Sequence, residues 1–200
     1  MKPSFLIICT FISLALLSGK TRVGEYYTGF GLGVVDDSNN LFEGEAFNVF
    51  VNSLASDSVD FDLQYTYSGL ETNSSKETVW ELGLGMRYHF DHFHDNEGMF
   101  RPFMGLGVHY LGDPASLMLE EDGFGWSLEV GAEISFTQNF SFLFYAELYG
   151  LWKDFQYNDF EINSEFTWWM DEEHGFSVGY LHVVDPEVDY FLFKYLYSWR

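Results

Sequence analysis

The chain has 200 residues, and its nine Lys and Arg against 31 Asp and Glu give a formal net charge of −22. This acidity argues against nucleic acid as a partner, because nucleic-acid-binding proteins need a basic surface to displace phosphate counterions. Aromatic residues make up 20% of the chain and apolar residues 47%, which argues against intrinsic disorder. The single cysteine, Cys9, lies near the N-terminus, so we expect no disulfide framework and no thiol nucleophile in a mature chain.

A secretory signal peptide is predicted at residues 1–19. Lys2 precedes an apolar stretch from Phe5 to Leu17, and Ser18 and Gly19 supply small residues for cleavage. The apolar stretch is shorter than the roughly 20 residues that a transmembrane helix needs. We therefore expect one domain over residues 20–200, with an uncleaved N-terminal anchor as the alternative.

From Val23 onward, apolar and polar residues alternate with a period of two, which is the period of a β-strand. The alternation is cleanest in the third, fourth, sixth and last of the segments listed below, where one face is apolar or aromatic throughout. About ten long strands are predicted, or eight if the region 139–184 pairs differently. In chain order the segments are 24–35, 41–53, 59–67, 80–90, 99–111, 124–136, 139–152, 157–170, 174–184 and 191–199.

The apolar faces of these segments predict contact with lipid rather than with a soluble core. They carry bulky side chains, whereas the opposite faces carry glycines such as Gly83, Gly85 and Gly131, which let a narrow barrel close. Tyr and Trp gather near the segment ends, as an interfacial girdle requires. Since only a closed sheet satisfies its backbone hydrogen bonds in lipid, we predict an all-β, closed antiparallel up-and-down transmembrane β-barrel. A soluble sandwich or barrel is the alternative.

An even number of strands places both termini on the periplasmic side, so the connections alternate between the two sides of the membrane. We expect outer connections at 36–40, 69–76, 112–122, 153–156 and 185–187. We expect inner connections at 54–57, 91–98, 137–138 and 171–173.

Three Gly-rich strands and the aromatic C-terminus resemble small outer-membrane barrels of the OmpA/OmpX-like kind. The Gly-rich stretches lie at 27–33, 101–110 and 123–132. The resemblance implies an outer-membrane location in a Gram-negative bacterium and a C-terminal signal for the barrel assembly machinery. Arg200 departs from the pattern, because it follows the last aromatic residue. The signal would comprise Phe191, Phe193, Tyr195, Tyr197 and Trp199.

Residues 86–90, 101–103 and 180–182 also resemble the lipid A deacylases of the PagL type, or acyloxyacyl hydrolases. That family carries a His-x-Ser pair on a late strand and a carboxylate on the next strand, which places nucleophile and base on one face. Here His182 is followed two residues later by Val184, and the last strand offers Asp189 near its start. His182 is a catalytic candidate only under this resemblance.

Five charged residues are predicted to share the barrel lumen. Asp60, Asp62, Glu161 and Glu165 are further candidates. We interpret the set as a polar interior that rigidifies the barrel, with a narrow cation-favouring pore as the alternative. Because Lys and Arg are too few to pair with the carboxylates, we expect several carboxyl groups to carry a proton at neutral pH. The predicted lumen cluster is Glu81, Arg87, Glu129, Glu133 and Glu147.

Two polar clusters lie at the ends of predicted strands. His92 and His94, close to His89, are weak candidates for a zinc site on an inner turn. Asp36-Asp37 and the acidic run 120–122 lie on predicted outer connections, where carboxylates could share Mg²⁺ or Ca²⁺ with lipopolysaccharide phosphates. The simpler interpretation is that the charged side chains of both clusters are merely solvated.

Together these features predict a non-enzymatic outer-membrane barrel with a structural or surface-interaction role and no cofactor. The expected partners are outer-membrane lipid, lipopolysaccharide and the assembly machinery, and we expect a monomer. The alternatives are a degenerate or inactive PagL-like deacylase and a narrow cation-favouring pore.

Overall fold

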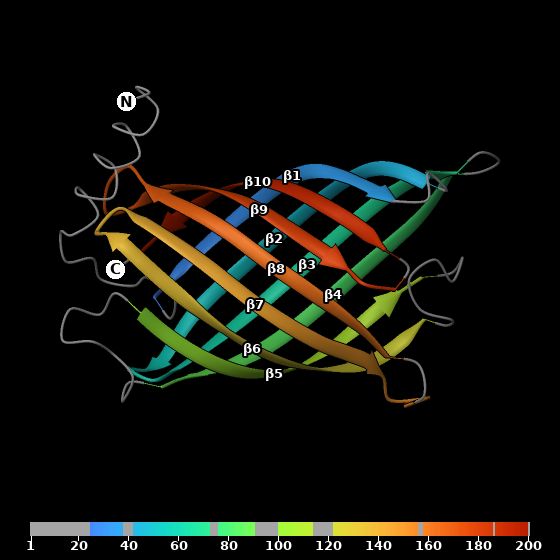
Figure 1. Cartoon of the computed structure of the whole chain (residues 1–200), viewed down its shortest axis with the longest axis horizontal. Coiled ribbons are helices and arrows are strands. Elements are labelled where there is room, and N and C mark those ends of the chain that lie inside the picture. Colours follow the sequence, from blue (N-terminus) through green and yellow to red (C-terminus); the bar gives the residue numbers. More distant parts are fainter. Residues whose placement is uncertain are drawn as a thin grey trace, which may run out of the picture.

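The computed structural model describes residues 25–37, 42–72, 76–90, 100–113, 122–155, 158–185 and 187–199, so the predicted signal peptide lies outside them. Ten antiparallel strands form a closed barrel in which sequence neighbours pair and β1 pairs with β10 (Figure 1). Ten strands are confirmed, rather than eight. They are β1 (Tyr27–Asp37), β2 (Phe42–Ser56), β3 (Val59–Thr72), β4 (Lys76–His89), β5 (Phe100–Gly112), β6 (Gly123–Thr137), β7 (Phe140–Leu151), β8 (Asn158–Trp169), β9 (His174–Val183) and β10 (Val188–Ser198).

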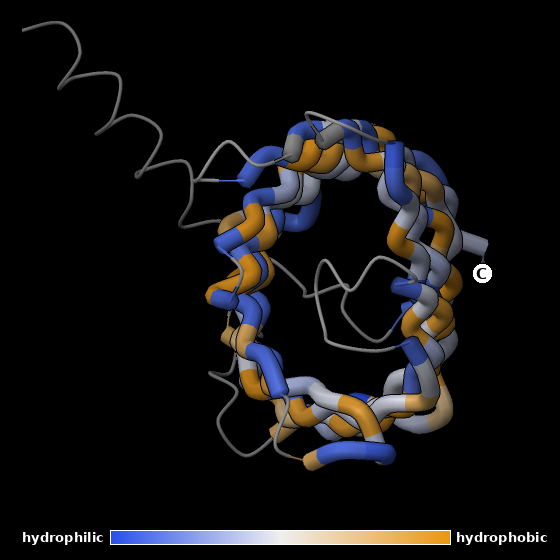
Figure 2. The backbone as a smooth tube through the Cα atoms, turned by 90° about the vertical axis from the view of Figure 1, so that its right-hand side faces the viewer, coloured by the Kyte–Doolittle hydropathy of each residue, from blue (hydrophilic) through white to orange (hydrophobic). Residues whose placement is uncertain are grey.

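The two faces of the barrel wall differ in polarity as predicted. Phe61 and Leu82 point outward and are 42% and 46% exposed, whereas Asp60 points inward and is fully buried. Trp126 and Tyr195 lie on the outward face, where neighbouring rings partly cover them. Figure 2, which looks along the barrel, shows hydrophobic and hydrophilic positions alternating around the ring. An outward apolar face and an inward polar face are the arrangement of a membrane barrel.

Outward aromatic rings gather near both ends of the barrel. Tyr26 and Trp199 lie together at the end that we call the inner end, where the Trp199 amide donates to the Tyr26 carbonyl oxygen at 3.2 Å. Near the opposite, outer end, Trp80 stacks on Tyr110 with ring centroids 5.3 Å apart. Rings at these two levels match the aromatic girdles that sit at the two membrane interfaces. Among the described residues, no helix has the length and hydropathy needed to cross a bilayer.

The strands extend further at the outer end than the sequence predicts. Asp36 and Asp37 belong to β1 rather than to a connection, and most of the predicted connection 69–76 is paired strand. Glu71 lies directly opposite Lys76 in the β3–β4 hairpin. The prediction was wrong here because it ended each strand where apolar alternation ends, whereas backbone pairing continues among polar residues beyond the apolar belt.

Inward glycines make room for the charged side chains of the lumen. Gly85 lies opposite Asp62, and a Cβ atom on Gly85 would lie 2.3 Å from the Asp62 Oδ1. Gly105 lies opposite Glu129, and its added Cβ atom would lie 2.2 Å from the Glu129 Oε1. Each carboxylate therefore occupies the space that a side chain on the neighbouring strand would fill.

We predict that Gly33→Ala destabilises the barrel, because a Cβ atom there would lie 2.0 Å from the Phe191 carbonyl oxygen. Backbone cannot yield as a flexible side chain can, so the expected loss is about 1–3 kcal/mol. Gly83→Ala is the control, because its added Cβ atom meets nothing closer than 3.5 Å. Urea unfolding in detergent micelles measures both, and equal stability of the two variants would contradict the prediction.

Candidate functional site in the barrel lumen

Arg87 and Glu129 form the central ion pair of the lumen. The Arg87 Nε donates to the Glu129 Oε1 at 2.6 Å, and Nη2 donates to Oε2 at 3.1 Å. This two-bond geometry is the stronger kind of charge-assisted hydrogen bonding. The guanidinium carbon also lies 5.3 Å from the ring centroid of Phe103 and 5.6 Å from that of Tyr145. The pair therefore links β4 with β6 across the intervening strand and is flanked by aromatic rings.

A second ion pair joins β10 to β8. The Lys194 Nζ donates to the Glu165 Oε2 at 2.6 Å, and it lies 5.4 Å from the ring centroid of Phe50. Glu165 was a predicted lumen candidate, but Lys194 was not identified as its partner. The alternation of β10 does carry the signal, because Lys194 lies between the outward residues Phe193 and Tyr195.

All five residues of the predicted lumen cluster lie on the inward face, but they do not form a single group. Glu129, Glu147 and Glu161 lie opposite one another on β6, β7 and β8, which makes a row of three carboxylates at one level. Glu81 lies on β4, with its Oε1 3.7 Å from the His109 Nδ1. Glu133 is buried and lies opposite Arg101, near the inner end.

Like charges directly opposite each other destabilise a sheet. Of the row of three, Glu129 is paired with Arg87. Glu147 and Glu161 lie directly opposite each other on the two adjacent strands. The arrangement supports the expectation that carboxyl groups in the lumen carry protons at neutral pH, and the expectation stays a prediction.

His89 takes part in a buried contact instead of the predicted turn cluster. Its Nε2 lies 3.0 Å from the Asp60 Oδ2, and both side chains are fully buried. Nearby, the Arg101 Nη2 donates to the Asp57 carbonyl oxygen at 2.7 Å, which ties β5 to the β2–β3 turn. The metal candidates His92 and His94 lie outside the described residues. Within the described ranges, no three His, Cys, Asp or Glu side chains converge as metal ligands.

A cluster of buried apolar side chains, which we call the apolar layer, lies in the outer part of the lumen, and the sequence did not predict it. Its members point inward from eight of the ten strands, and Leu70 and Val188 among them are 0% exposed. In a narrow barrel, side chains from opposite walls are close enough to fill the interior. The layer consists of Val35, Ala46, Leu70, Val79, Leu111, Leu151, Val183, Val188, Tyr190 and Leu192, with Tyr149 and Leu181 packed against it.

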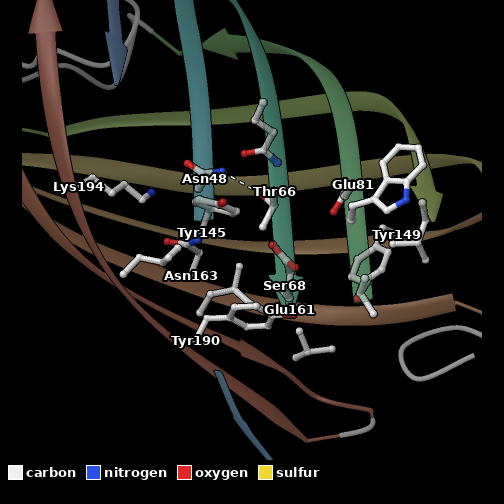
Figure 3. A pocket seen from close by; sticks show the side chains of 17 residues that line it. Asn48, Thr66, Ser68, Glu81, Tyr145, Tyr149, Glu161, Asn163, Tyr190 and Lys194 are labelled. Atoms are coloured by element: carbon white, nitrogen blue, oxygen red, sulfur yellow. Dashed lines mark hydrogen bonds between the residues drawn. The ribbon is translucent and has the colours of Figure 1, made fainter. Parts of the chain in front are cut away.

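Two small polar hollows lie on the inner side of the apolar layer. One of about 100 Å³ is lined by Asn48, Thr66, Glu81 and Glu161, among others, and by the apolar layer itself (Figure 3). Another, of about 30 Å³, adjoins the ion pair of Arg87 and Glu129. Hollows of this size have room for a few water molecules each.

The outward face of β9 and β10 carries a separate polar cluster close to the outer end. The His182 Nδ1 lies 2.8 Å from the Asp189 Oδ1, and the Tyr180 hydroxyl donates to the same oxygen at 2.6 Å. The predicted neighbours His182 and Asp189 are therefore in contact. Val184, at the position of the serine in the deacylase motif, offers no hydroxyl group.

Four of the five residues of the predicted assembly signal lie on β10, which closes the barrel against β1, and Trp199 directly follows that strand. The signal residues occupy every second position and face outward, and Phe191 and Phe193 are exposed at the barrel surface. Whether they direct assembly stays a prediction, because the fold places them but does not test their recognition.

Comparison with known proteins finds a family match and a set of similar folds. Residues 5–167 match the family described as outer membrane protein beta-barrel domain. No curated protein sequence matches the chain. An outer membrane channel from Pseudomonas putida F1 is 8% identical with a TM-score of 0.53, over 91% of this chain and 98% of that one.

Two further solved structures are similar at lower TM-scores. Neisserial surface protein A is 12% identical with a TM-score of 0.44, over 88% of this chain and 97% of its own. OprG from Pseudomonas aeruginosa is 16% identical with a TM-score of 0.39, over 92% of this chain and 100% of its own. At these identities the likeness concerns the fold alone.

We predict that Arg87→Met destabilises the barrel by about 3–5 kcal/mol, because it leaves Glu129 in the lumen without its two hydrogen bonds from the guanidinium. The double variant Arg87→Met/Glu129→Gln should recover much of the loss, since both charges are then absent. Urea unfolding in micelles measures all three proteins. A double variant no more stable than Arg87→Met would show that the ion pair is not what the arginine contributes.

Proposed function

Since the chain belongs to the outer membrane protein beta-barrel family, we propose that it is a structural and surface-interaction barrel without catalytic or channel activity. Its location is the outer membrane of a Gram-negative bacterium. Its partners in this proposal are outer-membrane lipid and lipopolysaccharide, with the assembly machinery acting during insertion, and the barrel works as a monomer.

The apolar layer is the single observation that supports a non-conducting barrel best. A hydrated ion that passes it must lose water among side chains such as Leu70, Leu111 and Val188, which offer no polar replacement. Hydrophobic constrictions of this kind block ions by excluding water. Porins of 16–18 strands, whose barrels leave an open aqueous channel, are also wider than a ten-stranded barrel.

The interior below the layer fits a structural role. Two ion pairs, Arg87–Glu129 and Lys194–Glu165, each connect two strands that are separated by one intervening strand. Such cross-links favour one arrangement of the ten strands over slipped registers. A rigid wall of this kind presents surface features at fixed positions, which is what a surface-interaction role needs.

The contact between His182 and Asp189 favours a second candidate function, a lipid A deacylase of rearranged or lost activity. A histidine oriented by a carboxylate is the base that such chemistry uses. The pair faces the lipid side near the outer end, where lipid A would lie. Val184 provides no nucleophile, so we propose that the site is inactive.

We predict that the purified protein gives no steady ohmic conductance in planar lipid bilayers, because the apolar layer excludes water. The triple variant Leu70→Ala/Leu111→Ala/Leu192→Ala should produce cation-favouring current steps, since the lumen beneath is rich in carboxylates. The control Leu63→Ala/Leu82→Ala/Leu106→Ala also removes three leucine side chains, but from the outward face, and should stay silent. Conductance of the unaltered protein would contradict the proposal, and a silent but folded triple variant would refute the role of the layer.

We predict that lipid A incubated with the protein keeps its full set of acyl chains, as read by mass spectrometry. The unaltered protein and His182→Ala should give identical spectra. Loss of an acyl chain with the unaltered protein, abolished in His182→Ala, would establish the deacylase instead.

A further inference from the structure

The larger of the two lumen hollows, of about 100 Å³, has a lining rich in oxygen atoms (Figure 3). Side chains from opposite parts of the barrel wall face it, and the function proposed above does not use it. Its polar lining combines carboxylates, amide groups and hydroxyl groups. We call it the lumen hollow; its oxygen-bearing lining is Asn48, Gln64, Thr66, Ser68, Glu81, Tyr145, Tyr149, Glu161, Asn163 and Tyr190.

Asn163 on β8 brings a buried acceptor that lacks a donor. The residue is only 7% exposed, and its side chain points into the lumen hollow in Figure 3. Among the described residues, no group donates a hydrogen bond to the Asn163 Oδ1. A buried carbonyl oxygen without a partner costs free energy, which a bound ligand would recover. The oxygen therefore points to an occupant that is a cation or carries an N–H or O–H group.

Glu161 places a carboxylate beside this oxygen. It lies two residues before Asn163 on the same face of β8, so the two side chains are neighbours on one wall of the hollow. Glu147 lies directly opposite Glu161 on β7, and carboxylates in such positions repel each other. A cation beside Glu161 would both offset this repulsion and give the Asn163 Oδ1 its missing partner.

The opposite wall adds a second carboxylate. Glu81 on β4 lies opposite Thr66 on β3, and both line the lumen hollow. Among the described lining residues, Lys194 is the one cationic side chain, and its Nζ already donates to Glu165 at 2.6 Å. The hollow therefore has two carboxylates, those of Glu81 and Glu161, without a lysine or arginine partner in its lining.

The donor set favours Ca²⁺ over other metal ions. Ca²⁺ takes about 6–8 oxygen ligands from carboxylates, amide carbonyls and water and tolerates irregular geometry, whereas Mg²⁺ demands a near-ideal octahedron. Softer metals prefer imidazole or thiolate ligands, and none of the described residues that line the hollow is His or Cys. Two carboxylates match a divalent charge, and the hollow has room for the water molecules that complete the shell.

We propose that the lumen hollow binds one Ca²⁺ ion. The Asn163 Oδ1 and the Glu161 carboxylate are direct ligands, and water molecules link the ion to Glu81 and Thr66 on the opposite wall. Because only one carboxylate is direct, the Kd should be about 0.1–1 mM. A proton on Glu161 competes with the ion, since a carboxylate must be deprotonated to bind a metal.

The test is the luminescence of Tb³⁺, which replaces Ca²⁺ in oxygen sites and emits when a nearby aromatic ring absorbs light. Trp80, Tyr145 and Tyr149 line the lumen hollow and should sensitise the bound ion. The protein is folded in micelles without lipopolysaccharide, at about pH 8 so that protons compete little. Tb³⁺ should give saturable emission, and Ca²⁺ should displace it at concentrations at least about tenfold lower than Mg²⁺ does.

Variants at the two direct ligands locate the ion. Asn163→Asp adds a charged ligand and should tighten Ca²⁺ binding about tenfold, whereas Asn163→Leu removes the oxygen and should weaken it about tenfold. Opposite effects at one position distinguish a ligand from a residue that only supports the fold. Glu161→Gln should abolish the emission that Ca²⁺ displaces. The control Glu43→Gln/Glu45→Gln removes two exposed carboxylates outside the lumen and should leave Ca²⁺ binding unchanged.

Emission that Ca²⁺ does not displace would overturn the proposal, and so would emission that survives Glu161→Gln but disappears in Glu43→Gln/Glu45→Gln. Equal Ca²⁺ affinity of Asn163→Asp and the unaltered protein would also overturn it, even if Asn163→Leu does not fold. Conductance is measured separately, so failure here leaves the non-conducting barrel untouched.

Discussion

The structure depends on one constraint: in a hydrocarbon layer, every backbone N–H and C=O group needs a partner within the protein. Pairing of β1 with β10 meets this constraint by leaving no free edge in the sheet. Closure then determines where the side chains go, because alternate residues along each strand must face either lipid or a confined interior. The bulky apolar residues take the lipid face, since the interior of a ten-stranded barrel has little room.

The confined interior explains how the chain accommodates its carboxylates. Gly85 opposite Asp62 and Gly105 opposite Glu129 show that a lumen carboxylate needs an empty position on the next strand. Arg87 and Lys194 neutralise two of the carboxylates, while the row that continues to Glu147 and Glu161 remains rich in acid. The apolar layer lies beyond this acidic region, so the barrier to ions that we propose adjoins an interior whose carboxylates would attract cations.

Much of the barrel could be predicted from the sequence, because a period of two persists through all ten strands. Alternation also predicts that Glu81, Arg87 and Glu129 share the lumen. It does not predict the partner of each charge, because the Arg87–Glu129 contact depends on the register of three strands at once. The contact of His182 with Asp189 was easier to anticipate, since the two lie in one hairpin.

Two features could not be predicted from single strands. The apolar layer takes only one to three residues from each contributing strand, so no segment shows it as a pattern. The outer ends of β3 and β4 remain paired beyond their apolar alternation, as Glu71 and Lys76 show, and local polarity there resembles that of a connection. Both features arise from registers that only the closed sheet defines.

The central claim is that apolar side chains face lipid and polar side chains face the lumen. The most direct test is to place one spin label on each face of the barrel wall and to measure which dissolved reagent each label meets. Cysteines introduced at Leu84 and Gln64 in a chain without Cys9 would carry the labels in lipid bilayers. The Leu84 label should collide frequently with dissolved oxygen and rarely with a water-soluble nickel complex, as a lipid-facing site does, and the Gln64 label should be shielded from oxygen. A Leu84 label shielded from oxygen beside a Gln64 label exposed to the nickel complex would contradict the membrane barrel and indicate a soluble one.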